Sequence, residues 1–319
     1  MSDPIYTAMI RAPMGDQAYW DGRVASYNNA IYKLTEALKI PSKNPAYRPQ
    51  FVWDLSFEYP RRALAQYSRG NPIIELSNPF SGLLDAWELS NKLTAELNAN
   101  LKPGESWDHR HLLTTAIVTN DKRGHNDARS WIFELTNLNH YNWCFWLVGL
   151  ALSLEIPDDQ WQRLLVLIGG EGEDMLLDRV IASRQPNRKI GDKLLHKKPY
   201  ARLLKAIEAK DKNLPQTEQA TLLKDFVENW YTELERKGNN ELWWYIYGDP
   251  VKNPLTNGSY FGRWCIEAVA AVKAFGLDDS LCLVHEHYPG DLLRPNGPST
   301  HPQREVQRLS WFSRLLGKK

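Results

Sequence analysis

The triplet Glu208-Ala209-Lys210 has the E-x-K form used by metal-dependent nucleases, and Asp192 lies upstream of it. The carboxylates of such a site must converge on one metal ion, usually from the strands of a mixed sheet. Here the triplet falls in a helical pattern within a basic stretch of chain. We therefore interpret it as the charged face of a helix rather than as a catalytic centre.

Two histidine-rich triplets, His109-Arg110-His111 and His285-Glu286-His287, contain side chains that can bind metals. Neither has cysteine partners or the spacing of His-Glu-x-x-His, so we expect surface or loop histidines and no bound metal or cofactor. The segment Gly169-Gly170-Glu171-Gly172 lacks the Lys-Ser/Thr pair that binds phosphate, and acids follow it. We interpret it as a flexible loop.

No catalytic residue is predicted, although a triad assembled in space leaves no mark in the sequence. Cys144, Cys265 and Cys282 form no CxxC pair, and we expect free thiols in a reducing compartment.

The net charge of +1 argues against nucleic acid as the main ligand. Residues 1–14 do not resemble a signal peptide, and the longest apolar run, 143–154, is shorter than the roughly 20 residues that span a bilayer. We expect a cytoplasmic protein without a nucleic-acid or membrane partner.

The elements that must position these residues are predicted to be helices. Trp20, Val24, Tyr27, Ile31, Leu34 and Leu38 recur at spacings of four and three, which is a helical stripe. Pro60 is expected to kink or split the second helix, and Asp278-Asp279 to begin a helix after Gly276. Helices are expected at 16–40, 50–69, from 78, 111–119, 128–138, 141–155, from 157, 174–183, 198–209, 217–237 and 260–275.

Sustained apolar and polar alternation is missing from the sequence, so few strands are expected. We predict an all-α fold, a bundle-like array of antiparallel helices. An N-terminal helical module at 8–130 is expected to pack against a C-terminal module at 131–300. Residues 301–319 form a basic amphipathic tail, which is expected to dock on its own domain more often than on a membrane.

The small net charge hides strongly signed blocks of sequence. Residues 151–180 contain seven acids and two arginines, and residues 181–215 contain ten Lys or Arg and three acids. Residues 218–249 contain seven acids and three bases, and residues 278–291 contain four acids and no base. These blocks either neutralise one another across helix packing or form an acidic face that attracts a basic partner. Both interpretations stay open.

The most distinctive residues lie near the C-terminus: YFGRWCIEAVAA at 260–271, DDS at 278–280 and YPGDL at 288–292. Together they resemble the C-terminal part of the PoNi family of bacterial immunity proteins. RAPMGDQAY at 11–19, YSRG at 67–70 and IIEL at 73–76 resemble the N-terminal part of the same family. The resemblance spans roughly residues 10 to 295, with a looser middle. Arg263 stands where the family usually has an aromatic residue, which leaves the role of this position open.

This resemblance implies an all-helical protein that binds and neutralises a cognate toxin. The family's known targets are nucleases that competing bacteria deliver by contact-dependent secretion, commonly type VI. The fold of the toxin is not implied. We expect a stoichiometric inhibitor that covers the active or substrate-binding site of its toxin, a type VI secreted DNase encoded by the adjacent gene. We leave open whether the inhibitor forms a homodimer.

The motif residues also have a physical interpretation. Gly262 at a helix start permits close backbone approach, and Trp264 begins an apolar helix face. Glu267 lies among apolar neighbours and is expected to pair with an arginine, because an unpaired buried charge is costly. Structural roles are assigned to Gly262, Trp264, Glu267, Asp278, Asp279 and Tyr288.

Charge and loop position suggest nine toxin contacts. They are Glu171, Glu173, Asp174, Asp178, Glu241, Trp243, Trp244, Asp249 and Asp291, the last presented by a turn at 288–291. One alternative is a helical scaffold or regulator without a toxin partner. Another is a metal-dependent hydrolase that uses the histidine triplets.

Overall fold

The fold was analysed in a computed structural model, which describes residues 9–43, 45–100 and 134–302. All regular structure in these ranges is helical and no strand occurs in them, so the predicted all-α class is confirmed. The α-helices are α1 (Gln17–Leu38), α2 (Arg48–Arg69), α3 (Pro79–Asn100), α5 (Leu138–Ser153), α6 (Asp158–Ile168), α7 (Met175–Ala182), α8 (Lys197–Asp211), α9 (Gln216–Glu233) and α10 (Ile266–Phe275). None of the described helices is both long and apolar enough to cross a bilayer.

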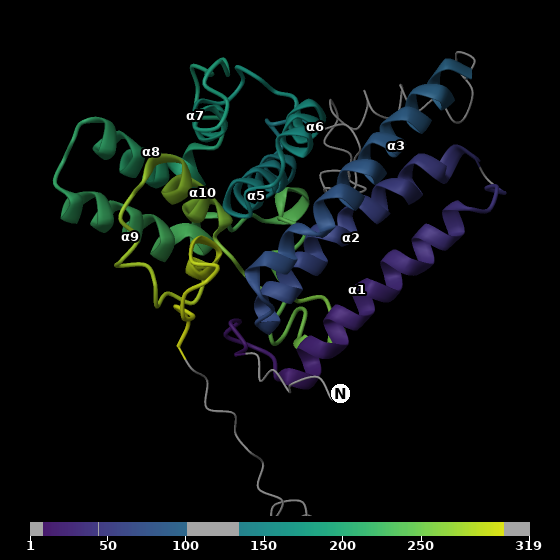
Figure 1. The fold of residues 1–319 in the computed structure, drawn as a ribbon, viewed down its shortest axis with the longest axis horizontal. Coiled ribbons are helices and arrows are strands. Elements are labelled where there is room, and N and C mark those ends of the chain that lie inside the picture. Colours follow the sequence, from purple (N-terminus) through teal and green to yellow (C-terminus); the bar gives the residue numbers. More distant parts are fainter. Residues whose placement is uncertain (1–8, 44, 101–133, 303–319) are drawn as a thin grey trace, which may run out of the picture.

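Helices α1, α2 and α3 form an antiparallel group of long helices (Figure 1). The predicted stripe on α1 faces inward, since Trp20, Val24, Tyr27 and Ile31 are buried. Helix α2 packs against both α1 and α3 and is not split at Pro60. Packing on both sides compensates for the hydrogen bond that proline removes, so the predicted split is wrong, and the alternative of a kink stays a prediction.

Helix α5 lies between the α1–α3 group and helices α7 to α10 (Figure 1). Every residue of α5 from Asn139 to Ser153 is buried, which confirms the predicted buried central helix. Helix α10 packs directly on it, because a Cβ at Gly149 would lie 2.6 Å from Cγ2 of Ile266. Helices α8 and α9 pack as an antiparallel pair beside them.

Two predicted boundaries are wrong. The helix expected at 260–275 begins only at Ile266, and residues 260–265 have no regular structure. No α-helix follows Asp278-Asp279, because hydrogen bonds and ion pairs within the C-terminal segment occupy these carboxylates. The helix expected at 111–119, most of the one at 128–138, His109, His111 and the tail beyond residue 302 lie outside the described residues.

Candidate functional site

The segment before α1 and the segment after α10 meet at a buried ion pair. Nε of Arg11 donates to Oδ2 of Asp291 at 2.6 Å, and both side chains are almost fully buried. Ser299 and Thr300 donate three more hydrogen bonds to the same carboxylate. Burial alone would raise the pKa of Asp291, but these donors and Arg11 outweigh it and lower the pKa. The pair therefore joins the two ends of the described chain.

Gly262 and Trp264 make a second contact between distant segments. Oγ of Ser68, near the end of α2, donates to the carbonyl of Phe261 at 2.9 Å and accepts from Nε1 of Trp264 at 2.8 Å. Gly262 has a φ of +107°, and a Cβ there would lie 2.1 Å from Nε1 of Trp264. Only glycine fits this left-handed position without displacing the indole.

Replacing Gly262 with alanine is therefore expected to lower the free energy of unfolding by about 2 kcal/mol or more, through backbone strain and the clash with Trp264. Gly276→Ala is the matched control: φ is +63°, but nothing lies within 4 Å of the added Cβ. The control is expected to cost about 1 kcal/mol, from the left-handed backbone alone. Urea unfolding of both variants measures the difference in unfolding free energy. Equal losses in the two variants would show that the clash with Trp264 does not contribute.

Glu267 lies in a neutral cage rather than beside an arginine. Its side chain is fully buried, and Oε1 accepts from Nδ2 of Asn142 at 2.8 Å and from the hydroxyl of Tyr200 at 3.1 Å. Burial raises the pKa of Glu267 to about 7, partly offset by its own backbone N–H and by the hydroxyl of Tyr200. The predicted arginine partner is wrong: neutral donors surround the buried carboxyl, and its raised pKa favours the uncharged, protonated form.

Asp279 and Tyr288 complete the buried polar structure of the C-terminal segment. The Tyr288 hydroxyl donates to Oδ2 of Asp279 at 2.6 Å, and Arg294 forms an ion pair with the same carboxylate at 2.5 Å. Oδ1 of Asp278 accepts from the backbone N–H of Ser280, so it closes a turn. Each of these contacts lies within the 278–294 segment and shapes its backbone.

A partly exposed surface lies where the C-terminal end of α9 meets the loop at 241–259. The rings of Tyr231 and Tyr245 stack there with centroids 4.4 Å apart and planes 9° apart. Glu235, Glu241 and Asp249 act electrostatically on Tyr231, and none of the three forms an ion pair within the described residues. We call this surface, defined by Tyr231, Tyr245, Glu235, Glu241 and Asp249, the acidic aromatic face.

Arg263 packs against a tyrosine of this face. Its guanidinium lies 4.6 Å from the ring centroid of Tyr231, and Nη2 donates to the carbonyl of Tyr247 at 3.0 Å. A cation stacked on an aromatic ring gains from the ring quadrupole. Arg263 thus packs against aromatic residues at a position where the sequence resemblance leads one to expect an aromatic residue.

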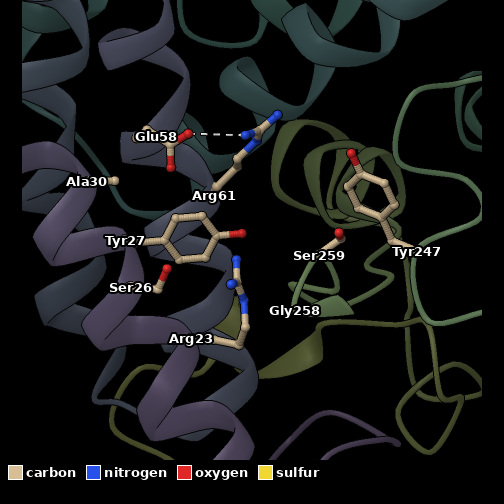
Figure 2. A pocket seen from close by; sticks show the side chains of 9 residues that line it. All are labelled: Arg23, Ser26, Tyr27, Ala30, Glu58, Arg61, Tyr247, Gly258 and Ser259. Carbon is tan, nitrogen blue, oxygen red and sulfur yellow. Dashed lines mark hydrogen bonds and ion pairs between the residues drawn. The ribbon is translucent and has the colours of Figure 1, made fainter. Parts of the chain in front are cut away.

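A pocket of about 290 Å³ opens beside the loop at 241–259. Figure 2 shows Arg23 and Tyr27 reaching it from α1, Glu58 and Arg61 from α2, and Tyr247 from the loop. Nη1 of Arg61 bonds Oε1 of Glu58 at 3.1 Å. The remaining lining residues are Ser26, Ala30, Gly258 and Ser259.

Both arginines also act on the acidic groups of the pocket. Burial raises the pKa of Tyr27, and Arg23 and Arg61 partly offset this rise. Burial likewise raises the pKa of Glu58 against the effect of the same two arginines. The pocket is thus a cationic hollow next to an acidic surface.

Comparison with known families shows which family has the sequence features of this chain. Residues 11–166 match the family model described as PoNe immunity protein (PoNi), N-terminal, and residues 172–292 match its C-terminal counterpart. The chain belongs to the PoNi family. The Arg11–Asp291 pair and the Ser68–Trp264 contact join residues of these two matched regions. A PoNi protein is an immunity protein, so its partner is a cognate toxin.

The PoNi fold is also found in a solved structure. The crystal structure of protein PA2201 from Pseudomonas aeruginosa matches with a TM-score of 0.60, over 91% of each chain and at 16% sequence identity. At that identity the likeness shows the fold alone. None of the curated proteins matches this PoNi chain.

Four of the nine predicted toxin contacts are buried in the PoNi structure. Asp174, Asp178, Trp244 and Asp291 each have 2% exposure or less. Asp174 accepts from the N–H of Leu177 at 2.7 Å and caps α7, and Trp244 donates to Asn142 at 2.9 Å. The expectation that these four lie at the surface is corrected, because each is held by partners within the chain.

The other five predicted contacts reach solvent. Glu171 and Glu173 are exposed in the loop before α7, although Glu171 also accepts from the N–H of Lys189 at 2.7 Å. Glu241, Trp243 and Asp249 are half-buried in the loop at 241–259. The ring of Trp243 packs on Phe57, with centroids 5.1 Å apart. The loop at 241–259 therefore holds three of the five, and the loop before α7 holds the other two.

The sequence patterns that suggested chemistry have structural roles here. The glycine-rich loop at 169–172 binds a carboxylate of its own chain, since the N–H of Gly172 donates to Oδ2 of Asp178. Glu208 lies in α8 and pairs with Lys212 at 3.5 Å. His287 is buried, which lowers its pKa to about 4. No group of three His, Cys, Asp or Glu within the described ranges could hold a metal ion.

Charge neutralisation between the sequence blocks accounts for part of the acidic surplus. Arg202, in the basic block, forms ion pairs with Asp225 at 2.5 Å and with Glu233 at 2.9 Å, both in the acidic block that follows. Arg188 pairs with Asp178, and Arg184 with Asp158. The acids of the acidic aromatic face have no such partners among the described residues. Neutralisation therefore holds for these paired residues, and the interpretation of an acidic face that attracts a basic partner stays a prediction.

Proposed function

We propose that this PoNi protein binds a nuclease toxin encoded by the adjacent gene, delivered by type VI secretion, and inhibits it by covering its active or substrate-binding site. Binding is stoichiometric and takes place in the cytoplasm of the producing cell. The observation that supports this proposal best is the match of both family models over almost the whole described chain. The boundary between modules at residues 130 and 131 and the open question of a homodimer stay predictions.

The acidic aromatic face is the surface that we propose for toxin binding. A nuclease needs a basic groove for phosphates, and unpaired carboxylates attract such a groove over several ångströms. Stacked tyrosines supply rigid apolar area that can anchor a buried interface centre. The face offers both features within one short stretch of surface.

Cell survival tests the proposed function directly. Expression of the neighbouring toxin gene alone is expected to kill the cell, and co-expression of this protein is expected to restore growth. A helical scaffold without a toxin partner would leave the toxin lethal. Equal killing with and without this protein would contradict the proposal.

Reversal of two acids on the face is expected to slow capture of the toxin. The double variant Glu235→Lys with Glu241→Lys should lower the association rate about tenfold or more at low ionic strength and flatten its salt dependence. Stopped-flow measurements at several salt concentrations give both quantities. The control, Asp159→Lys with Glu218→Lys, makes the same change in net charge on exposed residues at the starts of α6 and α9. Equal slowing by both pairs would show an effect of net charge alone.

A further inference from the structure

The pocket between α1, α2 and the loop at 241–259 contains guanidinium groups with unused donors (Figure 2). Arg23 forms no ion pair among the residues that the structure describes, and Arg61 uses Nη1 for Glu58. The Nε atoms of both arginines are buried and have no hydrogen-bond partner in the described part of the chain. A buried donor without a partner costs free energy, so the free protein holds both guanidinium groups at this place at some cost.

Stacking holds these two guanidinium groups in place. The Arg23 guanidinium lies 4.5 Å from the ring centroid of Tyr27. The Arg61 guanidinium lies 4.6 Å from the rings of both Phe57 and Trp243. A stacked, planar guanidinium is preorganised and loses less rotamer freedom when it binds an anion. The pocket is therefore prepared for an anionic group before that group arrives.

The charge of the pocket favours a carboxylate over a phosphate. Arg23 and Arg61 face one acid, Glu58, and leave a surplus of one positive charge in the lining. A carboxylate carries one negative charge, whereas a phosphate group carries about 1.5 to 2 at neutral pH. The acids of the neighbouring face repel a phosphate, with its larger charge, more strongly than they repel a carboxylate. The cavity of about 290 Å³ is large enough for a carboxylate side chain.

We propose that this pocket receives a carboxylate side chain, Asp or Glu, of the bound toxin. The proposal rests on the proposed function, since the toxin presents the carboxylate. Arg23 and Arg61 bind its oxygens with paired N–H donors, as guanidinium groups bind carboxylates elsewhere. The loop at 241–259 then contacts the toxin in two places. Tyr247 lines the pocket, and Glu241 and Asp249 belong to the acidic aromatic face.

The dissociation constant for the toxin encoded by the neighbouring gene tests the pocket. Arg23→Met and Arg61→Met keep an apolar stem over the aromatic rings and remove the charge. Each is expected to weaken binding about thirtyfold or more, since truncating one partner of a buried charge pair costs at least 2 kcal/mol. Arg62→Met is the matched control: Arg62 lies in the same helix, stacks on Tyr59 and does not line the pocket. It is expected to bind within about threefold of the wild type.

Replacement of each acid of the toxin by its amide identifies the bound group. One replacement is expected to weaken binding to the wild type and to have no further effect in Arg23→Met, as a double-mutant cycle requires. If Arg23→Met and Arg61→Met fold and bind the toxin with wild-type affinity, the proposal that the pocket binds the toxin is overturned and the proposed function is left intact. If the arginine variants bind the toxin more weakly but no acid of the toxin is coupled to Arg23, the bound group is not a carboxylate and that part of the proposal is overturned. A wild-type protein that fails to bind the toxin would overturn both proposals.

Discussion

Asp291→Ala is expected to lower the free energy of unfolding by about 3 to 5 kcal/mol, because it leaves Arg11 buried without a counter-charge. The variant also loses the hydrogen bonds that Asp291 accepts from Ser299 and Thr300. Arg11 keeps its bonds to the carbonyls of Tyr67 and Asn71, which are weaker partners for a cation. Urea unfolding monitored by tryptophan fluorescence measures the loss.

Asp158→Ala is the control for this prediction. Asp158 pairs with Arg184 at 2.6 Å, the same length as the Arg11–Asp291 pair, but its side chain is 92% exposed against 3% for Asp291. Exposed pairs contribute about 1 kcal/mol or less. A loss from Asp291→Ala as small as that from Asp158→Ala would show that the junction between the two ends of the chain does not stabilise the fold.

Glu267 is expected to make the protein less stable as the pH rises from about 4.5 to 7. Its ordinary pKa is 4.5, and burial raises it to about 7 in the folded chain. Between these values the folded state binds a proton that the unfolded state releases, so the free energy of unfolding falls with rising pH. Above both values the accumulated loss is about 3 kcal/mol.

Glu267→Gln removes this titration and keeps an acceptor for Asn142 and Tyr200. The difference in unfolding free energy between variant and wild type is therefore expected to shift in favour of the variant as the pH rises from 5 to 8. Glu218→Gln, at the start of α9, is expected to leave the wild-type profile in place. Parallel profiles of wild type and Glu267→Gln would contradict a raised pKa at Glu267.

Local sequence patterns predicted most of the helices that the structure describes. The stripe from Trp20 to Ile31 and the apolar run around Trp143 lie in buried positions as predicted. Periodicity failed at 260–265, where the left-handed Gly262 and the bond from Trp264 to Ser68 hold the chain out of helix. Those contacts join residues almost 200 positions apart, and no local pattern contains them.

Tertiary contacts determine the sites even more than they determine the helix boundaries, so the sites were harder to predict from the sequence. The burial of Glu267 followed from its apolar neighbours, but the cage of Asn142 and Tyr200 comes from other helices. Asp174 and Asp178 were expected at the surface, yet both are buried and organise the backbone around them. Glycine N–H groups near an acid are the one sequence signal that could have indicated this.

The arginine pocket was missed although parts of it leave a signal. Arg23 and Tyr27 are four residues apart, and Glu58 and Arg61 are three apart, spacings that place each pair on one helix face. Their convergence requires α1 to pack beside α2, and the loop at 241–259 to close the other side. Neither contact can be read from spacing within one helix.

Titration of the toxin with this protein tests the central proposal most directly. The nuclease activity of a fixed amount of the purified toxin from the neighbouring gene is measured after addition of increasing amounts of this protein. We expect activity to fall linearly and to reach zero at a fixed whole-number molar ratio that does not change with incubation time. Undiminished activity at a large excess, or inactivation that progresses with time at a small fraction of the toxin concentration, would contradict stoichiometric inhibition.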